Sequence, residues 1–193
     1  MTNELEIIQG CKNNDSYAQR VLFEMYGAQM KAVCGLYVKN ADQKEDLLQE
    51  SFIKIFSKIN DFDSRGVLRA WIRRIVVNTC LGYITRDKYA KNMVSSSDSL
   101  QYNEEIEDEE DEDDSEFDTL VEALDGETIH GCISLLKEDF RVVFVMFCID
   151  DMSHNEISSV LNITVGASRV RLNRAKEALK KLLLEVSTKE IKV

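Results

Sequence analysis

Apolar residues recur every three or four positions through most of this chain, and that spacing predicts an almost entirely helical protein. The clearest stripe would place four large side chains on one helix face: Leu48, Phe52, Ile55 and Ile59. In the first half of the chain, the pattern predicts helices over residues 4–10, 15–38, 42–59 and 67–89. In the second half, it predicts helices over residues 119–136, 138–149, 153–161 and 164–185.

Polar residues mark the starts of three of these helices. Asp42 with Glu45, and Ser153 with Glu156, follow the capping-box pattern, in which two side chains satisfy free amides at a helix N-terminus. Thr164 is suited to cap the last helix. A short helix, a three-residue break and a longer basic helix together predict a helix-turn-helix near the end of the chain.

The negative charge of the chain belongs to one segment. The 193 residues contain 24 Lys and Arg against 35 Asp and Glu, a net charge of −11. Thirteen of the acids lie in residues 98–118, which contain no Lys or Arg, so the rest of the chain has 24 basic and 22 acidic residues, a net charge of +2. Such dense like charge predicts a flexible linker over residues 92–118 between two helical bodies.

The composition supports the helical prediction and excludes several classes of protein. Proline is absent and Gly is only 8, so no helix is interrupted by a proline ring. The five cysteines are widely spaced, which indicates buried thiols in a reducing compartment. His130 and Cys132 are too few to ligate a metal. The first ten residues do not resemble a signal peptide, and no apolar run reaches the roughly 20 residues of a membrane span.

The last predicted helix has one apolar face and one basic face. The apolar face consists of Leu172, Ala175, Leu179 and Leu182. The residues that point nearly opposite, or flank that direction, are Arg169, Val170, Arg171, Asn173 and Arg174. Arginine can donate two hydrogen bonds to a guanine edge and asparagine can pair with adenine, so this face suits a DNA major groove. A solvated basic face is the alternative.

Three stretches in order resemble bacterial sigma factors of the sigma-70 family. Residues 46–56, DLLQESFIKIF, are similar to the D-L-x-Q-E-x-F-x-K signature of that family. Residues 68–78, LRAWIRRIVVN, are similar to its F-R-x-W-L-x-x-I-A-x-N helix. Residues 156–161 and 165–175 resemble its E-I-A-x-x-L … G-T-V-x-S-R-L-x-R-A ending. Two bodies with no middle domain resemble the extracytoplasmic-function group of the family.

Some positions depart from the family pattern. Lys137 follows Leu136 where the family usually has proline, and Gly166-Ala167-Ser168 replaces G-T-V. Val170 stands where the family has serine. These departures concern the sequence preference at the −35 element and not the fold.

The resemblance implies an all-α protein with two small domains joined by the acidic linker. Residues 1–91 would bind core RNA polymerase and the −10 promoter element, and residues 119–193 would bind the −35 element through the helix-turn-helix. The protein would initiate transcription in the cytoplasm as a non-enzymatic polymerase subunit, with no cofactor, no metal and no membrane insertion. An anti-sigma factor is a further partner that the resemblance implies.

The predicted site residues form three groups. Core polymerase would contact a polar stripe that the packing of Leu48 and Phe52 leaves exposed: Asp46, Gln49, Glu50 and Lys54. The loop at 61–66 offers acceptors, a hydroxyl, an arginine and a ring next to a basic helix, which suits capture of an unstacked base. With that helix, the predicted −10 group is Asp61, Phe62, Asp63, Ser64, Arg65, Arg69, Arg73, Arg74 and Asn78. The predicted −35 group is Thr164, Arg169, Val170, Arg171, Asn173, Arg174 and Lys180.

Several alternatives stay open at this point. Trp71 could pack in the core or stack on DNA. The acidic linker could act in the RNA path of the polymerase or serve as a solubilising spacer. A stand-alone helix-turn-helix regulator would use the same second body but needs a sensor or dimer surface in the first. An acidic interaction protein would leave the basic helices unexplained.

Overall fold

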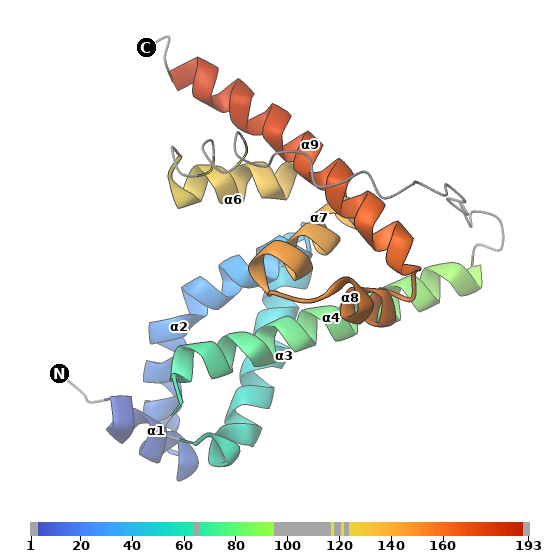
Figure 1. The fold of residues 1–193 in the computed structure, drawn as a ribbon. Helices are drawn as coiled ribbons and strands as arrows, with labels where there is room; N and C mark the ends of the chain where they lie inside the picture. Colours follow the sequence, from blue (N-terminus) through green and yellow to red (C-terminus); the bar gives the residue numbers. More distant parts are fainter. Residues whose placement is uncertain (1–3, 64–65, 95–116, 118–120, 122–123, 191–193) are drawn as a thin grey trace. The chain divides into compact units, whose positions relative to one another are not determined.

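The computed structural model describes residues 4–63, 66–94, 117, 121 and 124–190. All regular structure in these ranges is helical, which confirms the predicted all-α fold (Figure 1). The chain divides into two compact units, Met1–Lys88 and Tyr89–Val193. Apart from residues 92–94 and 117, the predicted linker over 92–118 lies outside the described residues.

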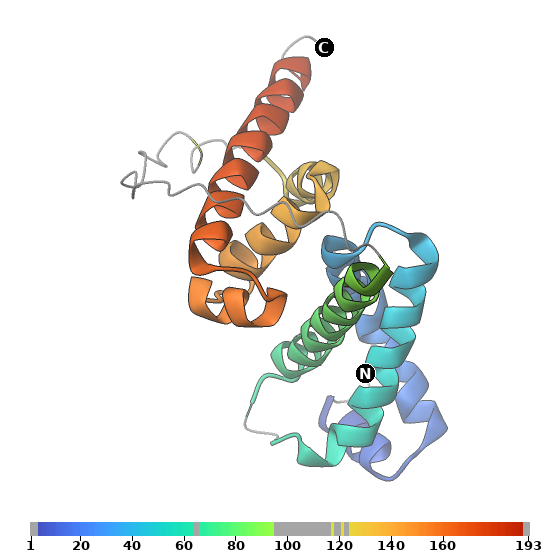
Figure 2. The ribbon, with the colours of Figure 1, turned by 90° about the vertical axis from the view of Figure 1, so that its right-hand side faces the viewer.

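The first unit is a small bundle of helices (Figure 2). Its elements are α1 (Glu4–Lys12), α2 (Ser16–Tyr37), α3 (Ala41–Lys58), the 3-10 turn η1 (Ile59–Asp61) and most of α4 (Leu68–Val94). Helix α1 packs against α2 and η1, and the Tyr26 hydroxyl donates to the Glu4 carboxylate at 2.8 Å. Burial and this hydrogen bond raise the pKa of Tyr26 to about 12. This bond therefore fixes α1 to the side of α2.

The apolar stripe predicted for the third helix lies in the core of this unit. Phe52, Ile55 and Ile59 are all buried, as is Leu48, which confirms the prediction from spacing. The start of α3 differs from the prediction: Asn40 is the N-cap, and its side chain accepts from the amides of residues 42 and 43. The predicted capping partner Glu45 pairs instead with Lys31 of α2.

Helix α4 buries most of the residues that its spacing predicts. Leu68, Ile72 and Thr79 are buried, whereas Ile75 is only half-buried and its neighbour Val76 takes the fully buried position. The buried Thr79 hydroxyl donates to the carbonyl of Ile75 at 2.9 Å, so the helix itself satisfies this polar group.

The second unit is built around one long helix. Its elements are α6 (Gly126–Leu135), α7 (Glu138–Phe144), the π-helical turn η2 (Val145–Ile149), α8 (His154–Leu161) and α9 (Val165–Glu190). Helix α6 begins later than predicted, because Asp125 accepts from the amides of residues 127 and 128 and caps the helix there. The buried Arg141 of α7 donates to the carbonyl of Leu136 at 3.3 Å, which fixes α7 to the end of α6.

Helix α9 packs on α6, α7 and α8 through one apolar face. Leu172, Ala175 and Leu179 are buried, as predicted. The prediction of Leu182 as the fourth core residue is wrong, because Leu182 is only half-buried. Leu183 is fully buried and takes that position. Leu183 follows Leu179 by four residues and so keeps the same face toward the core.

Helices α8 and α9 both have the predicted N-terminal caps. The Ser153 hydroxyl accepts from the Glu156 amide at 3.3 Å, and the Glu156 carboxylate accepts from the Ser153 amide at 2.8 Å, which confirms the capping box. These bonds from Ser153 lower the pKa of Glu156. Asn162 ends α8 in the left-handed conformation with φ 51. Thr164 Oγ1 then accepts from the Ala167 amide at 3.0 Å at the start of α9.

Four of the five cysteines are buried, but Cys148 is exposed, so the prediction of buried thiols is wrong for that residue. A hydrogen bond from Cys80 on α4 lowers the pKa of the Cys34 thiol on α2. Within the described residues, no group of His, Cys, Asp or Glu could hold a metal ion. No helix in this part of the chain is long and apolar enough to cross a membrane.

Candidate nucleic-acid and partner interfaces

The predicted polymerase-binding residues share one side of α3 but differ in exposure. Asp46 and Gln49 are exposed, and Glu50 and Lys54 are half-buried. The Lys54 ammonium lies 2.7 Å from the Glu50 carboxylate. It also donates to the Thr79 hydroxyl of α4 at 3.3 Å. The stripe therefore has a free part, at Asp46 and Gln49, and a part that is already engaged with α4.

A second contact ties the same stripe to α4. Arg86 Nη2 lies 3.8 Å from the second carboxylate oxygen of Glu50, and the Arg86 side chain is 69% exposed. An ion pair this long and exposed contributes little to stability, and the shorter contact with Lys54, at 2.7 Å, is the one that orients the Glu50 carboxylate. The result is a fixed acidic group at the edge of the exposed face, which suits docking against a charged partner.

Sequence reasoning missed one residue of this face. Ile53 is 69% exposed and lies one helical turn after Gln49. The signal was present in the sequence, because Ile53 stands outside the apolar stripe that Phe52 and Ile55 belong to.

The loop after η1 contains one exposed pair and one buried ring. Asp61 and Asp63 are exposed, whereas Phe62 is only 5% exposed, with its ring centroid 5.3 Å from that of Trp71. The Phe62 ring therefore packs in the core in this conformation, and its predicted contact with the −10 element stays a prediction. Ser64 and Arg65 lie outside the described residues.

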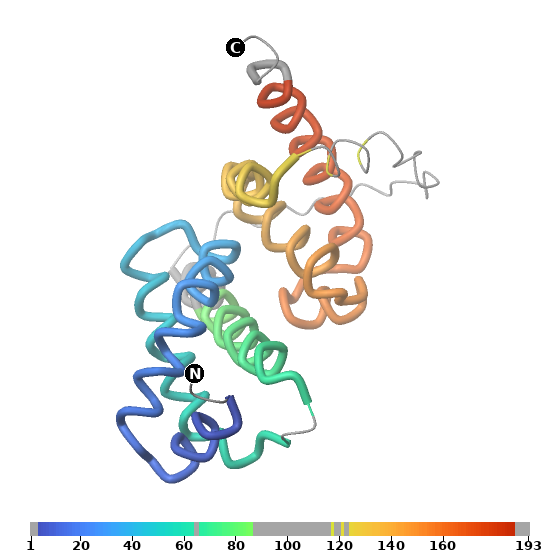
Figure 3. The backbone as a smooth tube through the Cα atoms, turned by 90° about the vertical axis from the view of Figure 1, so that its left-hand side faces the viewer, coloured from blue at the N-terminus to red at the C-terminus, as the bar shows by residue number. Residues whose placement is uncertain are grey.

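A lysine far away in the sequence also holds this loop. Lys12 Nζ donates to the Phe62 carbonyl at 3.2 Å. Figure 3 shows α1 next to η1 at one end of the unit, which the contact between these two elements supports. No local sequence pattern could have indicated this bond, since 50 residues separate its partners. Trp71 is half-buried against the Phe62 ring, so both of its predicted roles stay open.

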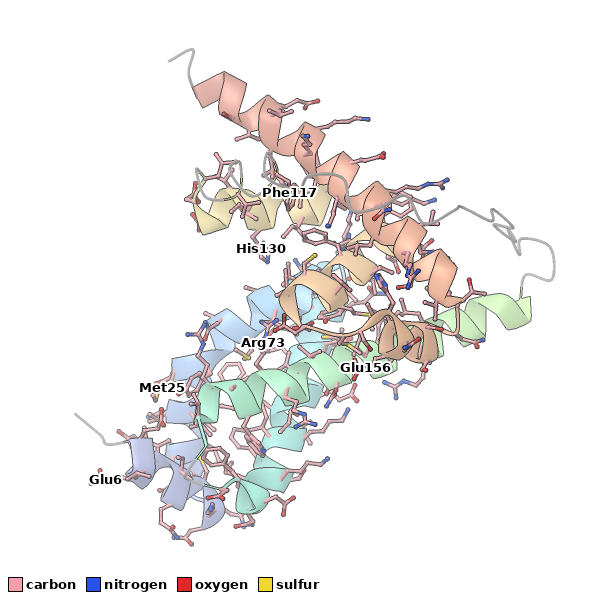
Figure 4. The ribbon with its side chains drawn as sticks, in the orientation of Figure 1. Glu6, Met25, Arg73, Phe117, His130 and Glu156 are labelled. Carbon is pink, nitrogen blue, oxygen red and sulfur yellow. The ribbon has the colours of Figure 1, made fainter. Side chains whose placement is uncertain are left out.

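The predicted −10 residues of α4, three arginines and an asparagine, form two pairs. Arg69 is exposed, and Arg73, labelled in Figure 4, is half-buried. Arg74 and Asn78 are both exposed. Each pair is spaced by four residues, and the two pairs lie about 140° apart around the helix axis. The structure therefore does not bring all four side chains onto one face. Arg74 and Asn78 lie on the solvent side, whereas Arg69 and Arg73 lie closer to the packed side.

On α9, the predicted DNA-facing residues also divide. Arg169 and Asn173 are exposed, and Val170, Arg174 and Lys180 are half-buried. Thr164 is exposed and caps the helix, so its hydroxyl has a structural role. Residues 169 and 173 are one turn apart and present their side chains together at the N-terminal half of the helix.

Arg171 does not belong to the exposed group. Its side chain is 24% exposed, and its Nη1 lies 3.9 Å from Asp139 of α7. In this conformation the guanidinium is directed toward α7, and the predicted contact of Arg171 with the −35 element stays a prediction. The ion pair instead helps to fix α9 against its neighbour.

A histidine joins the two helices of the helix-turn-helix. His154 Nδ1 lies 2.9 Å from the buried Ser168 hydroxyl of α9, and its ring stacks on Phe147 with centroids 4.5 Å apart. Burial lowers the pKa of His154, and the charge of Arg169 lowers it further. The imidazole is therefore neutral near pH 7 and can share a single hydrogen bond with Ser168. Sequence reasoning identified neither Ser168 nor Phe147, because the bond depends on the packing of α8 on α9. Figure 4 labels Glu156, which lies in the first turn of the same helix α8.

Comparisons with known proteins found two family models and several relatives that match this chain. The model for Sigma-70 region 2 matches residues 22–89, and the model for Sigma-70, region 4 matches residues 126–179. The chain is 29% identical over 183 residues to the ECF RNA polymerase sigma factor SigW of Bacillus subtilis, covering 93% of this chain and 96% of that protein. It is 24% identical over 179 residues to the RNA polymerase sigma-H factor of Pseudomonas aeruginosa, covering 92% of each.

A solved structure is also similar. It is the sigma factor RpoE in complex with the anti-sigma factor NepR from Bartonella quintana, with a TM-score of 0.45 and 18% identity over 85% of this chain and 95% of that one. The two family models match well over half of the chain, in the order that the sequence motifs predict. The chain therefore belongs to the extracytoplasmic-function group of the sigma-70 family and is a promoter-recognising sigma factor.

Proposed function

We propose that the two helical bodies divide the work of this sigma factor. Residues 1–91 bind core RNA polymerase through α3 and capture the −10 element through the loop at 61–66 and α4. Residues 119–193 bind the −35 element through α9. The observation that supports this division most directly is that exposed residues of each predicted group, such as Gln49 and Asn173, lie on separate helices that each bury an apolar face in their own unit.

On α3, the polymerase-binding group consists of Asp46, Gln49, Glu50 and Lys54. Charge complementarity across such a face steers encounter and fixes the register of docking. Lys54 and Glu50 already form an ion pair. The polymerase would therefore either bind the intact pair or replace one of its two residues with a charge of its own. Asp46 and Gln49 need no such rearrangement, so they would make the first contacts.

At the −10 element, the exposed carboxylates of Asp61 and Asp63 would bind the exocyclic amines of an unstacked base, and Ser64 and Arg65 belong to the same proposed loop. Unstacking a base costs a few kcal/mol, which contacts in a pocket must offset. The buried Phe62 ring would position this loop rather than touch DNA. Exposed Arg74 and Asn78 would contact the strand beside it, together with Arg69 and Arg73.

At the −35 element, Arg169, Asn173 and Arg174 would reach base edges from α9, and Val170 would contact a thymine methyl group. Lys180 would bind phosphate near the other end of the contact. Thr164 would take part through the capped N-terminus of α9, whose amides favour a phosphate oxygen.

Two further proposals rest on the family resemblance. The first is an anti-sigma factor that covers the DNA-binding and polymerase-binding surfaces. The second is a cytoplasmic location, where RNA polymerase and promoter DNA are found.

The test combines binding to core polymerase with run-off transcription. The double variant Gln49→Ala, Glu50→Ala should weaken association with core enzyme and keep its helicity, since neither side chain is in the buried stripe. Free protein should bind duplex DNA weakly, whereas holoenzyme should bind and open promoters, because affinity for phosphates depends on the number of contacts made at once. Nanomolar binding of the free protein to one operator, without association to core enzyme, would support the stand-alone regulator instead.

A further inference from the structure

The buried face of α9 contains a hydroxyl among apolar side chains. Ser168 is 0% exposed and lies one helical turn before the buried Leu172, at the start of the stripe that continues through Ala175 and Leu179. A buried hydroxyl costs free energy unless it forms a hydrogen bond, and an alanine there would complete the stripe without that cost. The reason for a serine at this position therefore lies in its hydrogen-bond partner rather than in packing.

That partner is the first residue of the preceding helix. His154 begins α8, and its Nδ1 lies 2.9 Å from the Ser168 hydroxyl. The imidazole also stacks on the Phe147 ring of η2, with the ring planes 22° apart and the centroids 4.5 Å apart. One half-buried ring therefore contacts both η2 and the first turn of α9.

The bond between His154 and Ser168 adds a direction to the packing of α8 on α9. Hydrophobic burial, such as that of Ile157 on α8, has no preferred direction and allows small shifts between helices. A hydrogen bond weakens steeply when its length or angle changes, so this one fixes the rotation of α9 relative to α8. The exposed Arg169 follows Ser168 directly, and the exposed Asn173 lies one turn further on. The direction in which these two side chains leave α9 thus depends on the bond.

We infer that His154, in its neutral form, is a positioning residue for recognition of the −35 element. It would hold the first turn of α9 so that Arg169 and Asn173 meet base edges in the register that discriminates between sequences. The inference rests on the proposed function, which assigns the −35 element to α9. His154 acts on DNA recognition through Ser168, and no contact of its own with DNA is required.

The surroundings of the imidazole make its protonation unfavourable. Burial lowers the pKa of His154, and the charge of Arg169 on α9 lowers it further. On the other side of the ring, η2 has no charged side chain, although Asp150 and Asp151 follow it in the turn that leads to α8. On α8 itself, the carboxylate of Glu156 is engaged by the capping box. The nearest charge that acts on the ring is therefore a positive one.

Acidification should break the link between the two helices. A histidine in solvent has a pKa of about 6.5, and the pKa of His154 in the folded unit is lower. The neutral imidazole and its bond to Ser168 are thus present above about pH 6.5 and are lost as the pH falls below that value. A protonated ring has no free lone pair and carries a charge beside Arg169, so it would turn out toward solvent.

The experiment measures base discrimination by holoenzyme assembled from the full-length protein, with a library of −35 variants and one fixed −10 element. The measured quantity is the ratio of affinities for the preferred and the singly substituted −35 sequences, which cancels general effects of pH on DNA binding. Between about pH 7.5 and about pH 5.5, on either side of the ordinary histidine pKa, this ratio should fall about tenfold for the parent. A merely structural role would lower stability, or the affinity for all sequences alike, and leave the ratio unchanged.

Three variants sharpen the test. Ser168→Ala should have the low ratio at both pH values, because it removes the hydroxyl and nearly keeps the buried volume. His154→Asn places an amide where Nδ1 stood and does not titrate, so it should keep most of the ratio at both pH values. His130→Asn, at the other of the two histidines of the chain, is the matched control. Its ratio should fall on acidification as that of the parent does.

Three results would each overturn the inference. They are a parent ratio that does not change with pH, a His154→Asn ratio that changes as the parent's does, and a parent-like pH profile of Ser168→Ala. Because the profile of the parent needs no substitution, the test stands even where a variant fails to fold.

Asn173→Ala separates this failure from a failure of the proposed function. If Asn173→Ala relaxes base preference while one of those three results holds, α9 reads the −35 element without help from His154. If Asn173→Ala leaves the base preference unchanged, the proposed −35 surface of α9 is wrong and the inference fails with it.

Discussion

The buried ring in the loop after η1 allows a decisive test of how promoter opening is organised. Phe62 is 5% exposed and packs on Trp71. A buried phenylalanine removes about 150–250 Å² from water. At about 25 cal/mol per Å², this corresponds to about 4–6 kcal/mol. Phenylalanine-to-alanine replacements in cores cost about 3–5 kcal/mol, so Phe62→Ala should lower the free energy of unfolding of the first unit by about 4 kcal/mol.

The protein contains a reporter for this measurement. Trp71 is the single tryptophan of the chain and lies in the first unit, so its fluorescence during urea unfolding reports that unit without a contribution from the second. Phe62→Leu retains most of the buried volume and should cost less than about 1.5 kcal/mol. It should also restore promoter opening by holoenzyme, because a core residue needs volume and not an aromatic face.

A specific pattern of results would refute this reasoning. If Phe62→Ala changed the unfolding free energy by less than about 0.5 kcal/mol, the range of surface substitutions, the ring would not be a core residue in solution. If Phe62→Leu also failed to open promoters while folding normally, the ring would stack on a base. Asp61→Ala supplies the contrast, since this exposed residue should impair opening with little effect on stability.

Three further predictions concern the other body and the acidic segment. Arg174→Ala should cost about 1–3 kcal/mol of binding free energy and relax the base preference at one −35 position. Lys180→Ala should weaken binding to all sequences alike and lower the slope of log affinity against log salt concentration by about one unit. Holoenzyme binding to a library of −35 variants at two salt concentrations measures both effects. Replacement of the ten acids in residues 104–114 by Ser and Gly should change the ratio of abortive to full-length transcripts and change promoter binding much less. Equal transcript profiles for variant and parent would indicate that the acidic segment is only a solubilising spacer. Leu183→Ala should destabilise the second unit by about 2–5 kcal/mol in thermal unfolding, well beyond the cost of Leu182→Ala, and equal costs would contradict the observed packing.

The spacing of residues along the sequence correctly predicted most buried helix positions and the capping box of α8. Phe52 is buried and Ser153 caps α8, because helical periodicity and capping chemistry act over a few residues. Contacts between elements could not be predicted in this way. Phe62 packs on Trp71, and Arg171 is directed toward Asp139 of α7, so in both cases a distant partner decides the direction of the side chain.

The candidate site shows the same limit. The sequence predicted which helices would carry the contacts, since motifs and charge lie along each helix. The sequence did not predict which residues of these helices are exposed and which are already paired with other side chains of the protein. Glu50 is half-buried and engaged by Lys54 and Arg86, while the overlooked Ile53 is exposed. The exposure of Ile53 could have been inferred from its place outside the apolar stripe, whereas the contact of Glu50 with Arg86 depends on α4, which no single stretch of sequence shows.

The position of α1 affects how the first body can be isolated. Region 2 of the family begins at residue 22, so a fragment cut at that boundary would retain the loop and α4 but lose α1. Removal of α1 would uncover apolar surface that Ile7, Ile8 and Cys11 now bury, and it would leave the Phe62 carbonyl without its lysine donor. A fragment that keeps the contacts of the loop after η1 therefore has to include α1, Glu4–Lys12, so the family boundary is not the physical boundary of the domain.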